Sequence, residues 1–175
     1  MKRMMCHRII VRLWVLICFV TMLSACRMSV SMTGGTIDPR AKTVAINTLP
    51  NNASLVNPTL SQSFTTALKD KIQGQTPLKI VNRQGDYEIE GEIVNYNISP
   101  VAIQGNETAA MNRLTITVKV RFSNKFDDTQ NFEQTFSRYA DYASSRNFSS
   151  VESTLVTEIS DALTDDIFNK AFVNW

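Results

Sequence analysis

The residues best suited to nucleophilic or metal chemistry lie together at the start of the chain. The single histidine is His7, and the three cysteines are Cys6, Cys18 and Cys26. The same stretch opens with the basic, acid-free segment MKRMMCHRIIVR and continues with the uncharged apolar run LWVLICFVTML. That run is shorter than the roughly 20 residues a transmembrane helix needs, and the pattern is typical of a removable export signal. We therefore predict that residues 1–25 form a signal peptide.

The tetrapeptide LSAC at residues 23–26 begins with the last residue of the apolar run and resembles a bacterial lipobox. In a lipobox the cysteine is acylated, with chains such as palmitate, and becomes the new N-terminus. The alternative is an ordinary secretory signal followed by a buried or paired Cys26, but Cys6 and Cys18 both lie inside the predicted signal. Because each buried methylene contributes about 0.8 kcal/mol, several acyl chains on Cys26 would anchor the protein to a membrane.

The residues after Cys26 predict where the protein resides. Arg27 occupies the position where the best-known inner-membrane retention signal has Asp, so the outer membrane is expected. Residues 27–30 also lack the acidic run that resembles a surface-export tag, so we expect the body to face the periplasm. Residues 26–40 are polar, contain a Gly pair and a Pro, and predict a flexible tether with a reach of at most about 46 Å.

Removing residues 1–25 narrows the classes of function. Residues 26–175 contain no histidine, and their only cysteine carries the predicted lipid. Imidazole catalysis, thiol catalysis and soft-metal binding are therefore excluded. Glu88, Glu90 and Glu92 alternate as solvent-facing strand residues do, which argues against a catalytic carboxylate pair. Residues 26–175 retain 14 basic and 16 acidic residues, so they lack the excess of positive charge that binding to nucleic acid requires. We predict no enzyme activity, no cofactor and no metal site.

The first half of the body predicts strands around one helix. Residues 43–49, 78–82 and 87–103 have strand patterns, and the apolar phase of the third shifts in a way that predicts a bulge near Ile93. Asn57 and Pro58 predict an N-cap and a first helical position, and Gly74 can end the helix. The apolar stripe of this helix of roughly 16 residues comprises Leu60, Phe64, Ala67, Leu68 and Ile72.

The second half predicts a hairpin and a long helix. Residues 113–122 alternate strictly between apolar and polar, and residues 132–142 follow after a turn, so the two should pair antiparallel. Ser149 and Glu152 fit a capping box that opens a helix running nearly to Trp175. Its stripe comprises Val151, Leu155, Ile159, Leu163, Ile167 and Ala171, and Asp161, Asp165 and Asp166 are expected on its solvated face.

Together these elements predict the α+β class. The simplest assembly is a two-layer α/β sandwich over residues 41–175, with two helices packed on one face of a mostly antiparallel sheet. The other face of the sheet should then be polar and in contact with solvent.

Four segments in this order resemble one known family. They are IDPRAKTVAINTLPNNASLVNPTLSQSFTTALKDKI, MNRLTITVKVRF, FSRYADY and IFNKAFVNW, and with the lipobox they resemble the Bacteroidota form of LptE, the lipopolysaccharide-assembly lipoprotein. The similarity covers nearly the whole predicted mature chain. It implies a two-layer sandwich that plugs the lumen of the outer-membrane barrel LptD and helps deliver lipopolysaccharide, without chemistry. It also implies that some members bind lipopolysaccharide through basic residues near the sheet.

Three cations on the polar side of residues 113–122 are candidates for such binding. Arg113, Lys119 and Arg121 could meet lipid phosphates, because Arg binds phosphate bidentately and Lys supplies a point charge. The alternative is that the three glutamates of the neighbouring strand pair with these cations, so that no ligand is needed. Tyr139 and Tyr142 could likewise meet a partner, but packing within the sheet is favoured for both.

The leading function is therefore an outer-membrane lipoprotein with lipopolysaccharide and an LptD-like β-barrel as partners. A rival from another class is a periplasm-facing lipoprotein that scaffolds a different envelope complex.

Overall fold

The computed structural model describes residues 37–55, 57–101 and 110–173. The predicted signal peptide, Cys26, the tether before Ile37 and Trp175 lie outside the described residues. The elements are β1 (Thr43–Ile46), α2 (Leu60–Gln75), β2 (Lys79–Val81), β3 (Tyr87–Val101), β4 (Met111–Asn124), the short 3₁₀ helix η1 (Asp128–Gln130), β5 (Phe132–Ala143) and α3 (Phe148–Phe172).

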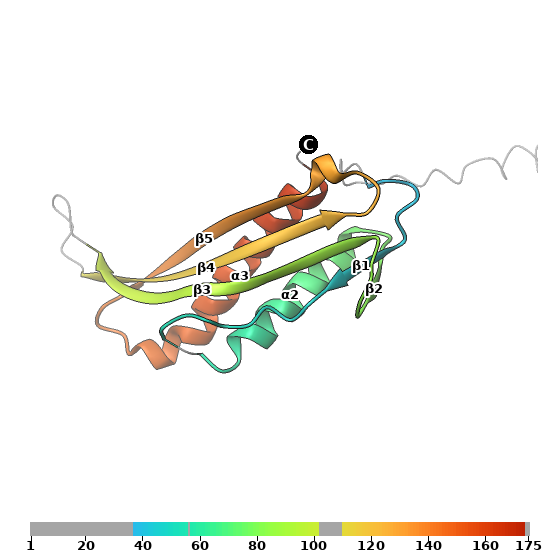
Figure 1. The fold of residues 1–175 in the computed structure, drawn as a ribbon. Helices are drawn as coiled ribbons and strands as arrows, with labels where there is room; N and C mark the ends of the chain where they lie inside the picture. The colour runs from blue at the N-terminus through green and yellow to red at the C-terminus, as the bar shows by residue number, and fades with distance from the viewer. Residues whose placement is uncertain (1–36, 56, 102–109, 174–175) are drawn as a thin grey trace, which may run out of the picture. The chain divides into compact units, whose positions relative to one another are not determined.

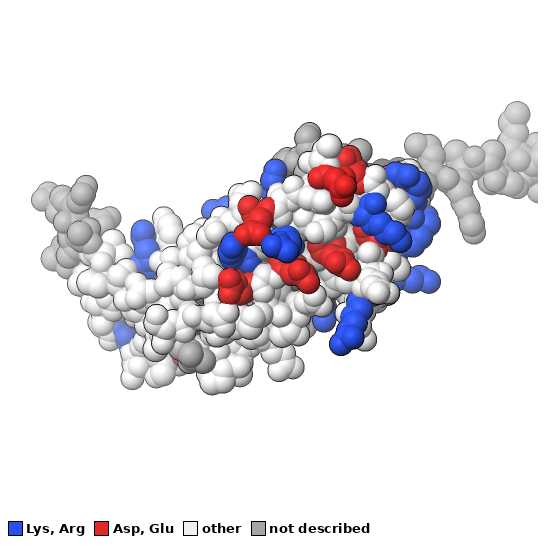
Figure 2. Space-filling model, in the orientation of Figure 1, with Lys and Arg blue, Asp and Glu red and all other residues white. Residues whose placement is uncertain are grey.

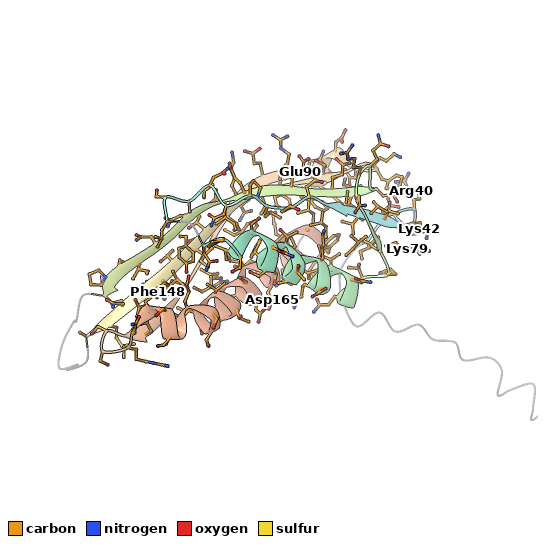
Figure 3. The ribbon with its side chains drawn as sticks, turned by 90° about the horizontal axis from the view of Figure 1, so that it is seen from below. Arg40, Lys42, Lys79, Glu90, Phe148 and Asp165 are labelled. Atoms are coloured by element: carbon orange, nitrogen blue, oxygen red, sulfur yellow. The ribbon has the colours of Figure 1, made fainter. Side chains whose placement is uncertain are left out.

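The strands form one mixed sheet in the order β2-β1-β3-β4-β5. Strand β1 is parallel to both β2 and β3, whereas β3, β4 and β5 pair antiparallel. Both helices lie on the same face of the sheet (Figure 1). The two layers are also visible in Figure 3, where Glu90 lies on the sheet side and Asp165 on the helix side. The predicted α+β two-layer class is confirmed.

The core lies between the helices and the inner face of the sheet. The apolar residues of β4 are almost completely buried, as their alternation predicts: Leu114, Ile116, Val118, Val120 and Phe122 are at most 1% exposed. The Phe122 ring lies 5.5 Å from Tyr87 and 5.7 Å from Phe172 of α3, centroid to centroid. Aromatic pairs at such separations add to the stabilisation from burial alone. The central strand and the long helix are thereby joined through one aromatic cluster.

Helix α3 is buried over a wider arc than one stripe. Besides the six residues of the predicted stripe, a second row is buried, consisting of Val156, Ser160, Thr164, Phe168 and Phe172. The reason is that α3 packs against β4, β5 and α2 together. Asp165 and Asp166 are also more than solvated surface, because they form salt bridges with Lys71 of α2 and Arg138 of β5.

The β1 region and β3 show how close backbone approach shapes the sheet. The bulge predicted near Ile93 is present between Ile93 and Asn95. Strand β1 ends at Ile46, before the predicted end at residue 49, but the chain stays beside β3, because Ile93 N donates to Pro50 O (2.8 Å). On its other side, Gly91 allows β4 to lie close to β3, since a Cβ there would lie 2.3 Å from the Lys119 carbonyl oxygen of β4; it would also lie 3.3 Å from a Leu49 methyl carbon.

The ends of α2 differ from the prediction. The helix starts at Leu60, so Pro58 precedes it and Thr59 occupies the N-cap position. Asn57 nevertheless caps by side chain, because its Oδ1 accepts from Leu60 N (3.1 Å). Gly74 does not end the helix, which continues to Gln75 and closes with a bond from Thr76 N to Ile72 O (2.9 Å).

The capping box predicted for α3 is wrong. Asn147 is the N-cap, and its side chain accepts from Ser149 N (3.1 Å), because an Asn side chain two residues earlier reaches the free amides first. Glu152 instead accepts from the Tyr96 hydroxyl (2.6 Å) and from Asn57 Nδ2 (2.7 Å). Burial raises the pKa of Tyr96, and the Glu152 hydrogen bond raises it further. This contact joins β3, α3 and the entry to α2.

The Tyr96 hydroxyl should therefore matter for stability. Tyr96→Phe should lower the free energy of unfolding by about 1 to 2 kcal/mol, because a half-buried carboxylate loses one donor. The measurement is the urea unfolding midpoint, with Tyr139→Phe as the matched control, since Tyr139 is 56% exposed. Equal midpoints for the two variants would contradict this role.

Candidate functional site

The three candidate cations lie on the outer face of the sheet, away from the helices. Arg113, Lys119 and Arg121 lie on the same face of β4, and the opposite face of this strand is buried. Figure 2 shows basic and acidic side chains meeting on this face, over the middle of the sheet. The prediction that one face of this strand is polar is confirmed.

Lys119 and Arg121 share one carboxylate from the neighbouring strand β5. Lys119 Nζ lies 2.5 Å from Glu133 Oε1, and an Arg121 guanidinium nitrogen lies 3.2 Å from Glu133 Oε2. The hydrogen bond from Lys119, followed by the one from Arg121, holds the pKa of Glu133 below its ordinary value of 4.5. All three side chains remain 42% to 62% exposed, so they pair in contact with water.

The carboxylates expected to pair with these cations have other partners. Glu90 lies opposite Arg121 and Glu92 opposite Lys119, as a cross-strand arrangement requires. Glu90 accepts from Asn47 Nδ2 (3.0 Å), and Glu92 accepts from Asn52 Nδ2 (2.7 Å). The expectation that these cations form cross-strand ion pairs is thus correct, but the carboxylate that pairs with Lys119 and Arg121 comes from β5 and not from β3.

Arg113 forms a separate arrangement further along β4. Its guanidinium donates twice to Asp141 of β5, at 2.7 and 2.8 Å, and lies 3.6 Å from the centroid of the Tyr139 ring. The hydrogen bond from Arg113 lowers the pKa of Asp141. Because a strand rises about 3.3 Å per residue, Arg113 is about 20 Å from Lys119, and the structure does not bring the three cations together.

The two tyrosines of β5 differ in burial. Tyr142 points inward and is 6% exposed, so the packing prediction is confirmed for it. Tyr139 faces outward and is 56% exposed, although one side of its ring packs against the Arg113 guanidinium. The reason is strand alternation: Tyr139 lies opposite Thr115 on the outer face, whereas Tyr142 lies opposite Asn112.

An open hollow of about 290 Å³ lies beside Lys119 and Arg121. Its lining consists of Pro50, Glu90, Gly91, Glu92, Lys119, Arg121 and Glu133. Three carboxylates against two cations make this hollow net negative, so an anion can bind there only by replacing Glu133 as the partner of the cations. This open hollow is suited to reversible contact with a polar partner and does not enclose a bound anion.

The described part of the chain contains no group of three or more His, Cys, Asp or Glu side chains placed to hold a metal ion. Within the same residues, neither helix combines the length and apolar character needed to cross a membrane.

The fold and this surface define a small two-layer α+β protein whose sheet exposes reversible ion pairs and no catalytic arrangement among the described residues. The family model for LptE, described as lipopolysaccharide-assembly, matches residues 41–171, and the chain belongs to this family. The resemblance found in the sequence is thereby confirmed. The family consists of non-enzymatic lipoproteins, which confirms the prediction that the protein is not an enzyme and agrees with a location in the cell envelope.

Solved structures add a comparison of folds. A hypothetical protein from Chlamydia trachomatis matches with a TM-score of 0.51 and 8% identity, over 77% of this chain and 100% of that one, which shows a shared fold. A minor lipoprotein from Acinetobacter baumannii has a TM-score of 0.49 and 15% identity, over 74% and 91% of the two chains. The rare lipoprotein B from Shewanella oneidensis has a TM-score of 0.46 and 14% identity, over 71% and 91%. No curated protein matches the sequence.

The shared carboxylate predicts a measurable pKa. Carbon-13 NMR should show Glu133 titrating below 4.5, and the value should return toward 4.5 in Lys119→Gln/Arg121→Gln. Because the folded-state pKa is depressed, the pairing stabilises the folded protein at neutral pH and is lost as the pH falls through that pKa. Arg113→Gln is the control and should leave Glu133 unchanged; an ordinary Glu133 pKa in the wild type would show that the pairs do not persist in solution.

Proposed function

We propose that the protein is the LptE component of a lipopolysaccharide-assembly complex, which plugs the lumen of an LptD-like outer-membrane β-barrel and assists lipopolysaccharide transport. The observation that carries this proposal is the family match over residues 41–171, which spans every described strand, α2 and all but the last residue of α3. The surface chemistry supports it, because the sheet face offers ion pairs and hydrogen-bonding groups for contact with a partner.

The proposal includes the membrane anchor. Residues 1–25 act as the signal peptide, acyl chains such as palmitate are attached to Cys26, and residues 26–40 tether the body to the periplasmic side of the outer membrane. The sequence LSAC after an apolar run supports this arrangement, as does membership in a lipoprotein family. The anchor keeps the body beside the membrane that contains the barrel.

Co-purification tests the partner. A C-terminally tagged protein solubilised from membranes in mild detergent should recover a large β-barrel protein in about equal amount, because a plug and its barrel associate one to one. Cys26→Ser is the matched variant and should reduce recovery, because the unanchored body is diluted away from the membrane. Recovery of the lipoprotein alone would contradict the plug, and recovery of a different envelope complex would favour the scaffold alternative.

The same proposal gives the sheet face a role in contact with lipopolysaccharide. Lys119 and Arg121 are the stronger candidates, because both remain exposed and a phosphate can take the place of Glu133. Arg113 is a third candidate, but it already donates two hydrogen bonds to Asp141 and contacts the Tyr139 ring.

Competition with Glu133 makes this role testable. Lys119→Gln/Arg121→Gln should weaken binding of purified lipopolysaccharide, whereas Glu133→Gln should strengthen it by removing the competing carboxylate. The melting temperature should change little in both variants, because exposed ion pairs contribute little to stability. The measurement is lipopolysaccharide binding by titration calorimetry at low salt, with Asp141→Asn reporting on Arg113 in the same way. Weaker binding by Glu133→Gln, or unchanged binding by the double variant, would contradict the role of these cations.

A further inference from the structure

Five exposed cations gather at the end of the sheet where the described chain begins. They are Arg40, Lys42, Lys79, Arg83 and Lys125, here called the basic end. Figure 2 shows basic side chains crowded at this end, and Figure 3 labels three of them at the same end of the molecule. The group is not part of the candidate site on the outer face of the sheet.

The fold brings these residues together from four separate segments. Lys42 precedes β1 and Lys79 opens β2, and Lys79 N donates to Lys42 O (2.9 Å). Arg83 lies in the turn between β2 and β3, next to Gln84, which has a φ of 54°. Lys125 follows β4, and its N donates to Asp86 O (3.0 Å). The Arg40 guanidinium lies over the Phe126 ring, 4.6 Å from its centroid. The basic end is therefore a product of topology and not of one basic segment.

The nearby carboxylates leave most of these cations available. Asp38 pairs with Arg40 (2.7 Å), which is the one salt bridge of the basic end among the described residues. Asp86 accepts hydrogen bonds from the backbone amides of Lys42 (2.9 Å) and Thr43 (3.1 Å), so its hydrogen bonds go to the start of β1, and Lys125 acts on it only as a nearby charge. The Lys42 ammonium donates to a carbonyl oxygen, Pro39 O (2.9 Å).

We propose that the basic end contacts the phosphate headgroups of anionic phospholipids in the leaflet that holds the lipid anchor. Arg40 is fourteen residues after Cys26, so it stays within about 46 Å of the anchor. Lys and Arg clusters next to an anchor are attracted to anionic leaflets, and an acyl anchor together with a basic patch binds a membrane more firmly than either alone. This inference rests on the proposed acylation of Cys26.

The geometry fits a surface better than a single bound phosphate. The five cations lie at the ends of several strands and in the turns between them, and they do not surround a common cavity. The neighbouring hollow, about 520 Å³, is lined by Lys125 of the basic end but also by Asp86, Glu88 and Asp128, which would repel a phosphate that entered it. A flat array of headgroups can instead meet the exposed cations from outside without entering this hollow.

The orientation of the body on vesicles tests this inference. The full-length lipidated protein is reconstituted into vesicles of phosphatidylethanolamine and phosphatidylglycerol that carry a headgroup-linked fluorescent acceptor. A donor dye is attached to Asn82→Cys at the basic end or, as the control position, to Ser144→Cys beyond the far end of β5. If Cys26 is acylated, the introduced cysteine is the only free thiol after residue 25, and labelling is specific.

Energy transfer should be more efficient from residue 82 than from residue 144. This difference should be lost in vesicles of phosphatidylcholine alone, and also when ionic strength rises from about 0.01 M to about 1 M, which shortens the Debye length from about 30 Å to about 3 Å.

Two variants with the same loss of charge separate the basic end from a general effect of net charge. The difference should be lost in the first variant, Lys42→Gln/Lys79→Gln/Arg83→Gln/Lys125→Gln. It should persist in the second, Lys69→Gln/Lys71→Gln/Arg138→Gln/Arg146→Gln, with circular dichroism confirming that both are folded.

Equal transfer from the two positions in anionic vesicles would overturn the inference, and so would a difference that the first variant retains. Incorporation of a second dye at Cys26, with loss of the protein from the vesicles, would overturn the anchor and this inference together. Failure to recover a barrel in the co-purification, with the orientation on vesicles intact, would overturn the plug alone.

Discussion

The structure depends on the burial of one face of strand β4 beneath helix α3. Five apolar side chains of β4 alternate toward the helices and are almost fully excluded from solvent, and α3 covers them with two adjacent rows of buried residues. The alternation leaves the polar residues of the same strand on the opposite face. The packing that holds the two layers together therefore also determines which cations remain available to a ligand.

The outer face satisfies its charges with carboxylates from within the sheet. Lys119 and Arg121 share Glu133, and Arg113 pairs with Asp141, so both acceptors come from β5. These pairs are exposed to water and contribute little to stability, but they leave the cations able to exchange partners. At the edge of the sheet, Arg138 on the inner face of β5 pairs with Asp166 of α3 (2.6 Å), and inward-facing charge of this kind discourages pairing with the edge of another sheet.

Much of the fold could be predicted from local pattern, because alternation and helical spacing report directly on burial. The strict alternation of RLTITVKVRF predicts β4, and the phase shift after Ile93 predicts the bulge. The N-cap residues are harder to predict from sequence, because neighbouring Asn, Ser and Thr side chains compete for the same free amides. At α3 the side chain of Asn147, and not that of Ser149, accepts the hydrogen bond. The apolar stripe does not predict the wide burial of α3, because a helix packed between a sheet and a second helix buries more than its most apolar stripe.

The ion-pair partners of the candidate site required the register of the hairpin. Each cation of β4 has one neighbour on β3 and one on β5, and composition alone favours the row of glutamates on β3. Once the turn places Phe122 opposite Phe132, Glu133 must lie opposite Arg121, and Asp141 opposite Arg113. Alternation along β5, and not this register, places Tyr139 on the outer face with Glu133. Turn geometry, which is weakly encoded in single residues, therefore decides the chemistry of this surface.

Both the proposed assembly role and the proposed contact with phospholipid require that the body be held beside a membrane by acyl chains on Cys26. Intact-mass spectrometry of the protein purified from membranes tests this requirement most directly. If Cys26 is acylated, the purified chain should begin at Cys26 and carry the added mass of a diacylglyceryl group. A chain that retains residues 1–25, or one that begins at residue 26 with an unmodified thiol, would contradict it.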